Sequence, residues 1–210
     1  MWILVALVVL LALLALRPAG ASAPRAEYAY APLHVAAVLT PAECDRLIAH
    51  AAPRLERSRT LAGVSAVRTS EQAWIRPTDV DVGDLVERIR ARTSQLVGTY
   101  REDLFEQLQV VRYVPGQEYR PHHDACVAEC DVAQRIHRRA TLLVYLTDDF
   151  EAGATYFPKI DARFKPKRGD AVLFYNADAG TGVLDASLHA GEPVLRGTKW
   201  VANCWVRYDA

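Results

Sequence analysis

Short runs of strand-forming residues, separated by turn residues, fill most of the second half of this chain. The runs span residues 109–113, 141–146, 155–157, 170–175 and 199–208. Pro115-Gly116, Gly153, Gly169 and Gly191 lie between them. Many short strands with glycine and proline at the turns predict a double-sheet jelly roll.

Two amphipathic helices are predicted before these strands. Thr40-Pro41-Ala42-Glu43 combines a capping box with proline at the first helical position, and apolar residues then recur on one helical face. The second helix runs through Leu85, Ile89 and Leu96 toward Tyr100. Helices followed by many short strands predict an α+β fold, a double-stranded β-helix (jelly roll) with N-terminal supporting helices.

The first sixteen residues, MWILVALVVLLALLAL, contain no charged or polar side chain. As a helix they would reach roughly 24 Å, which is marginal against a hydrocarbon core of roughly 30 Å. Ala21-Ser22-Ala23 suits a signal-peptidase site. A signal peptide usually has a lysine or arginine before its apolar run, however, and this sequence has none there. We therefore favour a membrane anchor through residues 1–16 over a cleaved signal.

The sequence divides into an N-terminal anchor or signal segment over 1–23, a linker over 24–31 and one folded domain over 32–210. Arg17 and Arg25 follow the apolar run, and the positive-inside tendency would keep the domain in the cytoplasm behind the anchor.

Composition excludes some classes of function. The formal net charge is zero and the basic residues form no run, so no nucleic-acid partner is expected. Four cysteines are too few and too scattered for a disulfide scaffold. Cys44 and Cys204 are interpreted as core residues, whereas Cys126 and Cys130 could pair across a tight loop or pack there.

His122-His123-Asp124 holds candidate metal ligands near a predicted strand end. Alternate residues of a strand point to the same face, so His122 and Asp124 can both turn inward. His123 should point the other way, toward packing or the mouth of the site. The third ligand must come from a distant strand, and His189 fits best because it lies just before one. His122, Asp124 and His189 are called the triad below.

Two imidazoles and one carboxylate could hold ferrous iron with positions left open for a co-substrate and O₂, or Zn²⁺ with a water. Lys199 discriminates between the two. It lies on the strand after His189, just before the apolar run Trp200-Val201-Ala202, where a buried ammonium requires an anion. A dicarboxylate co-substrate would provide that anion, which favours oxygen chemistry.

The chain from about Pro32 onward resembles the prolyl 4-hydroxylase family of 2-oxoglutarate/Fe(II)-dependent dioxygenases, in its short, single-domain form. The blocks that carry the resemblance are 108–124, 152–158, 165–174 and 189–203. Four ordered blocks at compatible spacing are more specific than the His-x-Asp pattern alone.

The resemblance implies a metal centre and a co-substrate site. Its iron ligands would be the triad, and Lys199 would pair with the distal carboxylate of 2-oxoglutarate. Tyr113 and Thr155 fall where the family places hydroxyls near the co-substrate. The implied cofactors are Fe(II), 2-oxoglutarate and L-ascorbate, with O₂ as the oxidant. The residues of the metal centre are the only catalytic residues it implies.

The resemblance also indicates a substrate groove. Arg68 and Trp74 occupy a family-like stretch and would line this groove together with His123, although a surface arginine and a core tryptophan are equal alternatives. Trp200 and Trp205 match aromatic positions that are expected to fill the core.

The implied activity is hydroxylation of peptidyl proline at the 4-position, with a proline-containing peptide or protein as partner. Two alternatives stay open: the same chemistry on a free amino acid, non-prolyl side chain or small metabolite, and a non-catalytic jelly-roll sensor of metal or ligand. The domain would be cytoplasmic in a bacterial host and in the endoplasmic-reticulum lumen of a eukaryote. The sequence predicts no oligomeric state.

Overall fold

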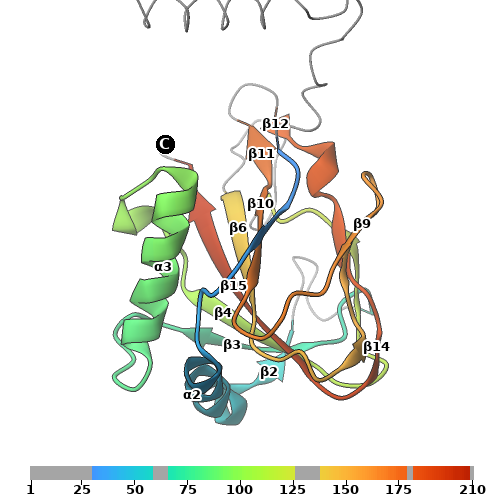
Figure 1. Ribbon diagram of the computed structural model, residues 1–210, viewed down its shortest axis with the longest axis horizontal. Coiled ribbons are helices and arrows are strands. Elements are labelled where there is room, and N and C mark those ends of the chain that lie inside the picture. The colour runs from blue at the N-terminus through green and yellow to red at the C-terminus, as the bar shows by residue number, and fades with distance from the viewer. Residues whose placement is uncertain (1–29, 59–65, 126–137, 179–181, 209–210) are drawn as a thin grey trace, which may run out of the picture. The chain divides into compact units, whose positions relative to one another are not determined.

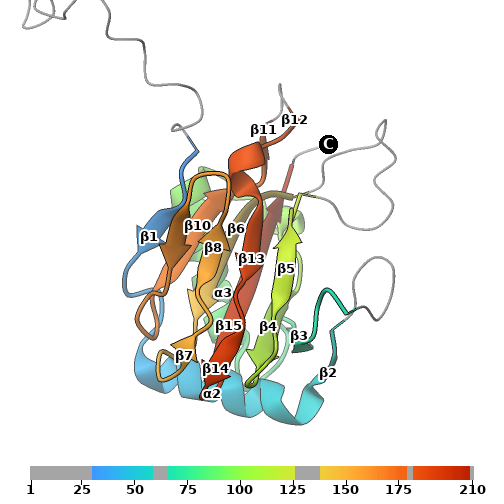
Figure 2. The same ribbon diagram turned by 90° about the vertical axis from the view of Figure 1, so that its right-hand side faces the viewer.

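Two antiparallel sheets face each other, and two helices cover the outer face of the larger one (Figures 1 and 2). The computed structural model describes residues 30–58, 66–125, 138–178 and 182–208. The chain from Ala31 onward forms one compact unit. The predicted anchor and nearly all of the predicted linker lie outside the described residues. Within the described part, none of the helices has the length and apolar character that crossing a bilayer requires.

The larger sheet has seven strands. In spatial order they are β1 (Leu33–Val35), β10 (Ala171–Tyr175), β6 (Arg138–Tyr145), β15 (Lys199–Arg207), β4 (Leu108–Tyr113), β3 (Glu71–Ile75) and β2 (Glu56–Arg57). The smaller sheet consists of β5 (Tyr119–His122), β13 (His189–Gly191), β8 (Thr155–Phe157) and β9 (Ala162–Phe164). Two further pairs are β11 (Ala177–Asp178) with β12 (Gly182–Val183), and β14 (Val194–Arg196) with β7 (Glu151–Ala152). This arrangement is the double-stranded β-helix that the sequence predicts.

Alternation along the central strands divides the core into two layers. Val110, Leu142 and Ala202 point toward the helices, whereas their neighbours Val111 and Leu143 point into the space between the sheets. Because successive side chains of a strand face opposite ways, each central strand contributes apolar side chains to both layers. The layer between the sheets leaves room at one end for the site described below.

Helix α2 (Pro41–Ala51) begins as predicted. Thr40 accepts a hydrogen bond from the backbone of Glu43, whose carboxylate accepts one from the Thr40 backbone in return. Helix α3 (Gly83–Val97) ends before Gly98, which adopts a left-handed φ of 69°. Three short 3-10 helices complete the described structure: η2 (Ala52–Arg54), η3 (Glu102–Leu104) and η4 (Asp185–Ser187).

The five predicted strand runs correspond to β4, β6, β8, β10 and β15, with ends that differ by at most three residues. The remaining strands were not predicted as separate elements. All of these described strands have two to five residues, which is too short for an alternation pattern to stand out. The buried Cys44 and Cys204 lie in the core as expected, while Cys126 and Cys130 lie outside the described residues.

Replacing Gly169 by alanine should destabilise the fold strongly. Gly169 has a φ of 86°, and a Cβ atom there would lie 2.1 Å from the carbonyl oxygen of Leu39. Gly116 has a similar φ of 83° but open space around it. Gly116→Ala should therefore cost about 1 kcal/mol of unfolding free energy and Gly169→Ala about 3 kcal/mol or more. Urea denaturation measures both, and equal losses would contradict the steric explanation.

Candidate metal and co-substrate site

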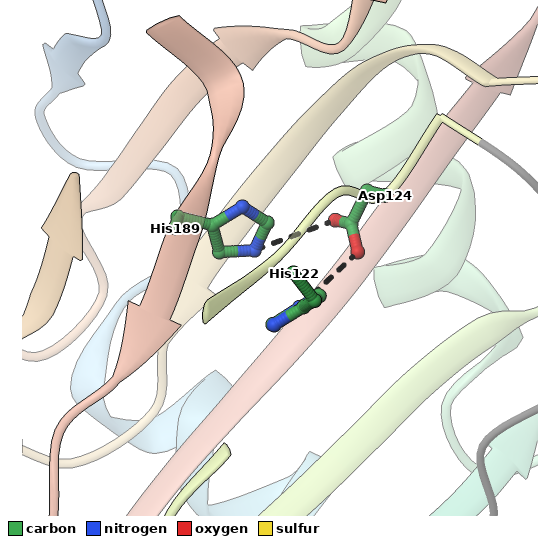
Figure 3. A group of neighbouring side chains, drawn as sticks. All are labelled: His122, Asp124 and His189. Atoms are coloured by element: carbon green, nitrogen blue, oxygen red, sulfur yellow. Dashed lines mark ion pairs between the residues drawn. The ribbon is translucent and has the colours of Figure 1, made fainter. Parts of the chain in front are cut away.

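The triad meets at the end of the space between the two sheets (Figure 3). His122 is the last residue of β5 and His189 is the first of β13, and the two are direct partners in the register of these strands. Asp124 follows in the bend after β5. The Nε2 atom of His122 lies 3.6 Å from Oδ1 of Asp124, and that of His189 lies 3.8 Å from Oδ2. Their ligand atoms all lie within 4.8 Å of one another, so one ion can contact all three.

Backbone carbonyls fix the tautomer of both histidines. Nδ1 of His122 lies 2.8 Å from the carbonyl oxygen of Arg120, and Nδ1 of His189 lies 2.9 Å from that of Ser187. A carbonyl oxygen only accepts hydrogen bonds, so Nδ1 carries the proton in each ring. In the neutral ring the lone pair then lies on Nε2, which is the usual arrangement around metal-binding histidines.

The charge states of Asp124 and His189 also suit a divalent metal. Burial is the main cause that lowers the pKa of His189 to about 4, so its imidazole is neutral at physiological pH. Burial alone would raise the pKa of Asp124, but His189, His122 and Arg138 together hold it well below its ordinary value. A carboxylate with neutral imidazoles is the donor set that Fe(II) takes in non-haem oxygenases. The residues present fit the ion.

A pocket of about 650 Å³ connects the triad to the ammonium of Lys199. Lys199 is only 2% exposed, and its Nζ donates a 2.8 Å hydrogen bond to the carbonyl oxygen of Gly153. Among the described residues, no other acceptor contacts Nζ and no carboxylate pairs with it. Burial is the main cause that lowers the Lys199 pKa to about 7. A buried cation with unused N–H groups requires an anionic ligand.

The two predicted hydroxyls lie near this ammonium. Tyr113 is the partner of Lys199 in the register of β4 and β15, and Nζ lies 5.4 Å from the centre of its ring. Thr155 on β8 also lines the pocket, and its Oγ1 lies 2.6 Å from the hydroxyl of Tyr145. The inner end of the pocket thus combines one cation with hydroxyl groups, which suits a carboxylate. Sequence reasoning did not find Tyr145, because its buried strand position predicts only a core residue.

All three predicted groove residues line the same pocket. Arg68 is buried rather than on the surface, and its guanidinium lies 4.8 Å from the centre of the Tyr119 ring. Trp74 is 38% exposed rather than in the core. His123 is not part of the ligand group that the triad forms, and its Nδ1 lies 3.2 Å from the hydroxyl of Ser187. Contact of these residues with a substrate stays a prediction.

Trp205 is buried as expected, but it does more than fill the core. Its Nε1 donates a 3.0 Å hydrogen bond to Oδ2 of Asp124, and Thr141 donates another of 3.0 Å to the same oxygen. The sequence placed Trp205 and Thr141 on strands and gave no sign of this contact. A pair of donors on strands is visible only once the register of β6 and β15 is known.

Comparison with known proteins identifies the family. The model of the 2OG-Fe(II) oxygenase superfamily matches residues 108–207. A putative prolyl 4-hydroxylase of Acanthamoeba polyphaga mimivirus is 37% identical over 180 residues, which are 81% of this chain and 71% of that protein. Prolyl 4-hydroxylase 1 of Arabidopsis thaliana is 37% identical over 191 residues, covering 82% and 67% of the two chains.

A solved structure agrees with these relatives. The viral collagen prolyl hydroxylase of Paramecium Bursaria Chlorella virus-1, in its 2OG complex, superposes with a TM-score of 0.69 at 33% identity. The match covers 85% of this chain and 96% of that one. The fold and the site define a 2-oxoglutarate/Fe(II)-dependent oxygenase. Within that class, this chain belongs to the prolyl 4-hydroxylase family.

Proposed function

We propose that this chain is a 2-oxoglutarate- and Fe(II)-dependent dioxygenase that hydroxylates peptidyl proline at the 4-position. The observation that carries the proposal is one pocket that holds both a two-histidine, one-carboxylate triad and a buried ammonium that has no carboxylate partner among the described residues. A zinc hydrolase does not need the buried ammonium. A dioxygenase of this class needs both, because its co-substrate is a dicarboxylate that also contacts the metal.

Each part of the pocket has a role in this reaction. The triad would hold Fe(II) with positions left open for the co-substrate and O₂. When bound, Fe(II) and 2-oxoglutarate activate O₂, so that one oxygen atom enters the substrate and the other enters succinate, with loss of CO₂. Lys199 and Thr155 hold the distal carboxylate, which orients the keto acid toward the triad. Buried apolar side chains such as Leu143 and Val201 line the pocket and exclude water.

Proline as the substrate is supported by the relatives and by aromatic residues of the pocket lining. The relatives from mimivirus and Arabidopsis are named prolyl 4-hydroxylases, and the viral structure is a collagen prolyl hydroxylase. Trp74 and Tyr119 contribute aromatic side chains to the pocket lining. Aromatic surfaces suit proline-rich segments, which are preformed and lose little entropy on binding.

The proposal is tested with purified protein, Fe(II), 2-oxoglutarate, L-ascorbate and a panel of proline-rich peptides. We expect one added oxygen atom per modified proline, 4-hydroxyproline on amino-acid analysis, and succinate in equal amount. Cell lysate is treated in parallel. Unmodified peptides together with a hydroxylated metabolite or non-prolyl side chain from the lysate would reject proline and leave the chemistry in place.

Binding of 2-oxoglutarate should take up protons above neutral pH. With a Lys199 pKa of about 7, most of its amine is neutral at about pH 8, and the bound dianion should raise this pKa and draw a proton from solution. We expect uptake approaching about one proton per ligand at about pH 8, and little at about pH 6. Calorimetry of Mn(II)-loaded protein in buffers of different ionisation enthalpy measures this. Binding heats independent of buffer at about pH 8 would contradict it.

We further propose that residues 1–16 attach the full chain to a membrane. The wholly apolar run and the absence of a preceding basic residue support an anchor. The domain would face the cytoplasm in a bacterium and the endoplasmic-reticulum lumen in a eukaryote. Full-length protein should remain with membranes after carbonate washing and be released by detergent. Mature protein that begins after Ala23 and is found in the soluble fraction would show a cleaved signal instead.

A further inference from the structure

Three amide side chains lie in a row on the inner face of the larger sheet. They are Gln72 on β3, Gln109 on β4 and Asn203 on β15, which are neighbouring strands (Figure 1). Asn203 and Gln109 are direct partners in the strand register, and Gln72 is the partner of Val111, the next residue on this face of β4. All three line the pocket, within an otherwise apolar layer. We call Gln72, Gln109 and Asn203 the amide row.

The guanidinium of Arg68 fixes the orientation of the amide row. Its Nη2 can only donate, and it lies 3.2 Å from Oε1 of Gln109, which also accepts from Nδ2 of Asn203 at 3.1 Å. The reversed amide of Gln109 would place an NH₂ group against the guanidinium. Nε2 of Gln109 therefore faces Gln72, and it donates to Oε1 of Gln72 at 2.8 Å. The direction of each amide thus follows from one cation.

The amide row has one unused acceptor and one unused donor. Oδ1 of Asn203 and Nε2 of Gln72 make no hydrogen bond with any described residue, although Gln72 is only 5% exposed. Neither atom is among the solvent-inaccessible side-chain atoms that lack a partner in the described structure, so both open into the pocket that these residues line. A ligand that fills this part of the pocket has to offer a donor to Asn203 and an acceptor to Gln72.

A peptide main chain offers both groups, whereas 2-oxoglutarate does not. The carboxylates and the keto oxygen of 2-oxoglutarate only accept hydrogen bonds, so this molecule cannot satisfy the oxygen of Asn203. Each main-chain amide carries one N–H donor and one C=O acceptor, and an extended, proline-rich chain makes no internal hydrogen bonds. Proline itself has no N–H. The donor to Asn203 therefore comes from a residue of the peptide other than the proline that is hydroxylated.

The two ends of the amide row lie at different distances from the triad. Asn203 is two residues from Trp205 on the same face of β15, roughly 7 Å along the strand, and Trp205 contacts Asp124. Gln72 is two residues from Trp74 on β3, which lies two strands and roughly 10 Å from β15. Each residue of an extended peptide spans roughly 3 Å. Asn203 can thus reach a neighbour of the proline at the triad, and Gln72 a residue further out.

We propose that Asn203 and Gln72 are substrate-binding residues that contact the main chain of the peptide. Oδ1 of Asn203 accepts from the N–H of a residue adjacent to the target proline, and Nε2 of Gln72 donates to a main-chain carbonyl further away. Gln109 holds both amides in place without contacting the substrate. This inference rests on the proposed function. It makes a proline within a peptide a better substrate than the free amino acid, which has no neighbouring N–H.

Replacing single N–H groups of a substrate tests the contact with Asn203. A hydroxylated peptide with one proline is made with an ester oxygen in place of one main-chain N–H at a time. With wild-type protein, the ester on one side of the proline should raise the peptide KM by about tenfold, because the oxygen of Asn203 is left unpaired. The kcat should change by less than about twofold, since the contact is made equally before and during the reaction. Equal KM values for the amide peptide and both adjacent esters would overturn the proposal.

Variants connect the effect to the two residues. Asn203→Leu removes the acceptor and should abolish the difference between amide and ester peptides, whereas Gln95→Leu, at an exposed position of α3, should retain it. Gln72→Leu should raise the KM of the full peptide by about tenfold and leave unchanged that of a peptide with one residue on each side of the proline. An Asn203→Leu protein that still discriminates between amide and ester would refute the contact. The wild-type comparison needs no variant and decides the question if Asn203→Leu does not fold.

The outcomes separate this inference from the proposed function. Hydroxyproline in none of the peptides would remove the proposed function and the main-chain contacts together. Hydroxyproline in the amide and ester peptides at the same KM would remove the main-chain contacts alone and leave the dioxygenase assignment in place. A difference of about tenfold that disappears in Asn203→Leu supports both.

Discussion

Replacing His122 by glutamine is expected to reduce the turnover of 2-oxoglutarate by about a thousandfold or more. The variant removes one of the two imidazoles of the triad, whose Nε2 is kept free for the metal by the hydrogen bond between Nδ1 and the carbonyl of Arg120. Loss of a metal-bound imidazole costs several kcal/mol of transition-state stabilisation, which corresponds to such a factor. Succinate release measures turnover, and calorimetry with Mn(II) measures the accompanying loss of metal binding.

His34→Gln is the matched control for this variant. His34 also lies on a strand, but its side chain is 51% exposed and it pairs with Asp170. The His34→Gln variant should keep Mn(II) affinity and turnover within about twofold of the wild type, as surface substitutions usually do. If His122→Gln retained both properties as well as His34→Gln does, His122 would not be a metal ligand.

Replacing Lys199 by methionine is expected to raise the KM for 2-oxoglutarate by a factor of about 10²–10³. The change leaves the distal carboxylate of the co-substrate buried and unpaired, and breaking a buried ion pair in this way costs about 3–5 kcal/mol. The folded protein loses nothing comparable, since Lys199 has no carboxylate partner among the described residues. The free energy of unfolding should therefore stay the same or increase.

A raised KM for 2-oxoglutarate together with an unchanged or increased free energy of unfolding distinguishes a ligand-binding lysine from a structural one. Lys167→Met, at an exposed position near β10, should change neither the KM nor the stability. Urea denaturation and initial rates at varied 2-oxoglutarate concentration give the two quantities. A Lys199→Met protein that unfolds more easily and binds 2-oxoglutarate normally would show that the ammonium stabilises the fold instead.

The longer elements could be predicted from the sequence because their local signals agree with the fold. The capping box at Thr40 and the apolar periodicity of α2 and α3 act within one or two helical turns, and the apolar runs of β6 and β15 are long enough to recognise. Strands such as β5 and β13 have only three or four residues. Their existence depends on pairing with each other across the fold, which no local pattern shows.

The site residues also divide into those with a local sequence signal and those whose role depends on contacts across the fold. His122, Asp124 and Lys199 could be proposed because their residue types are costly or unusual where the pattern places them. The relation between His122 and His189 as strand partners, and the two donors to Oδ2 of Asp124, depend on register between distant segments. Trp205 was therefore expected only in the core. The exposure of Trp74 on β3 and the burial of Arg68, which bridges to Tyr119, likewise depend on contacts between distant segments.

The central claim is tested most directly by following the two atoms of O₂. A proline-rich peptide that the protein modifies is incubated with it, Fe(II), 2-oxoglutarate and ¹⁸O₂, and both products are analysed by mass spectrometry. We predict one ¹⁸O atom in 4-hydroxyproline and one in succinate, in equal amounts. Hydroxyproline without ¹⁸O, or peptide oxidised without production of succinate, would contradict the assignment of this pocket as a 2-oxoglutarate-dependent dioxygenase site.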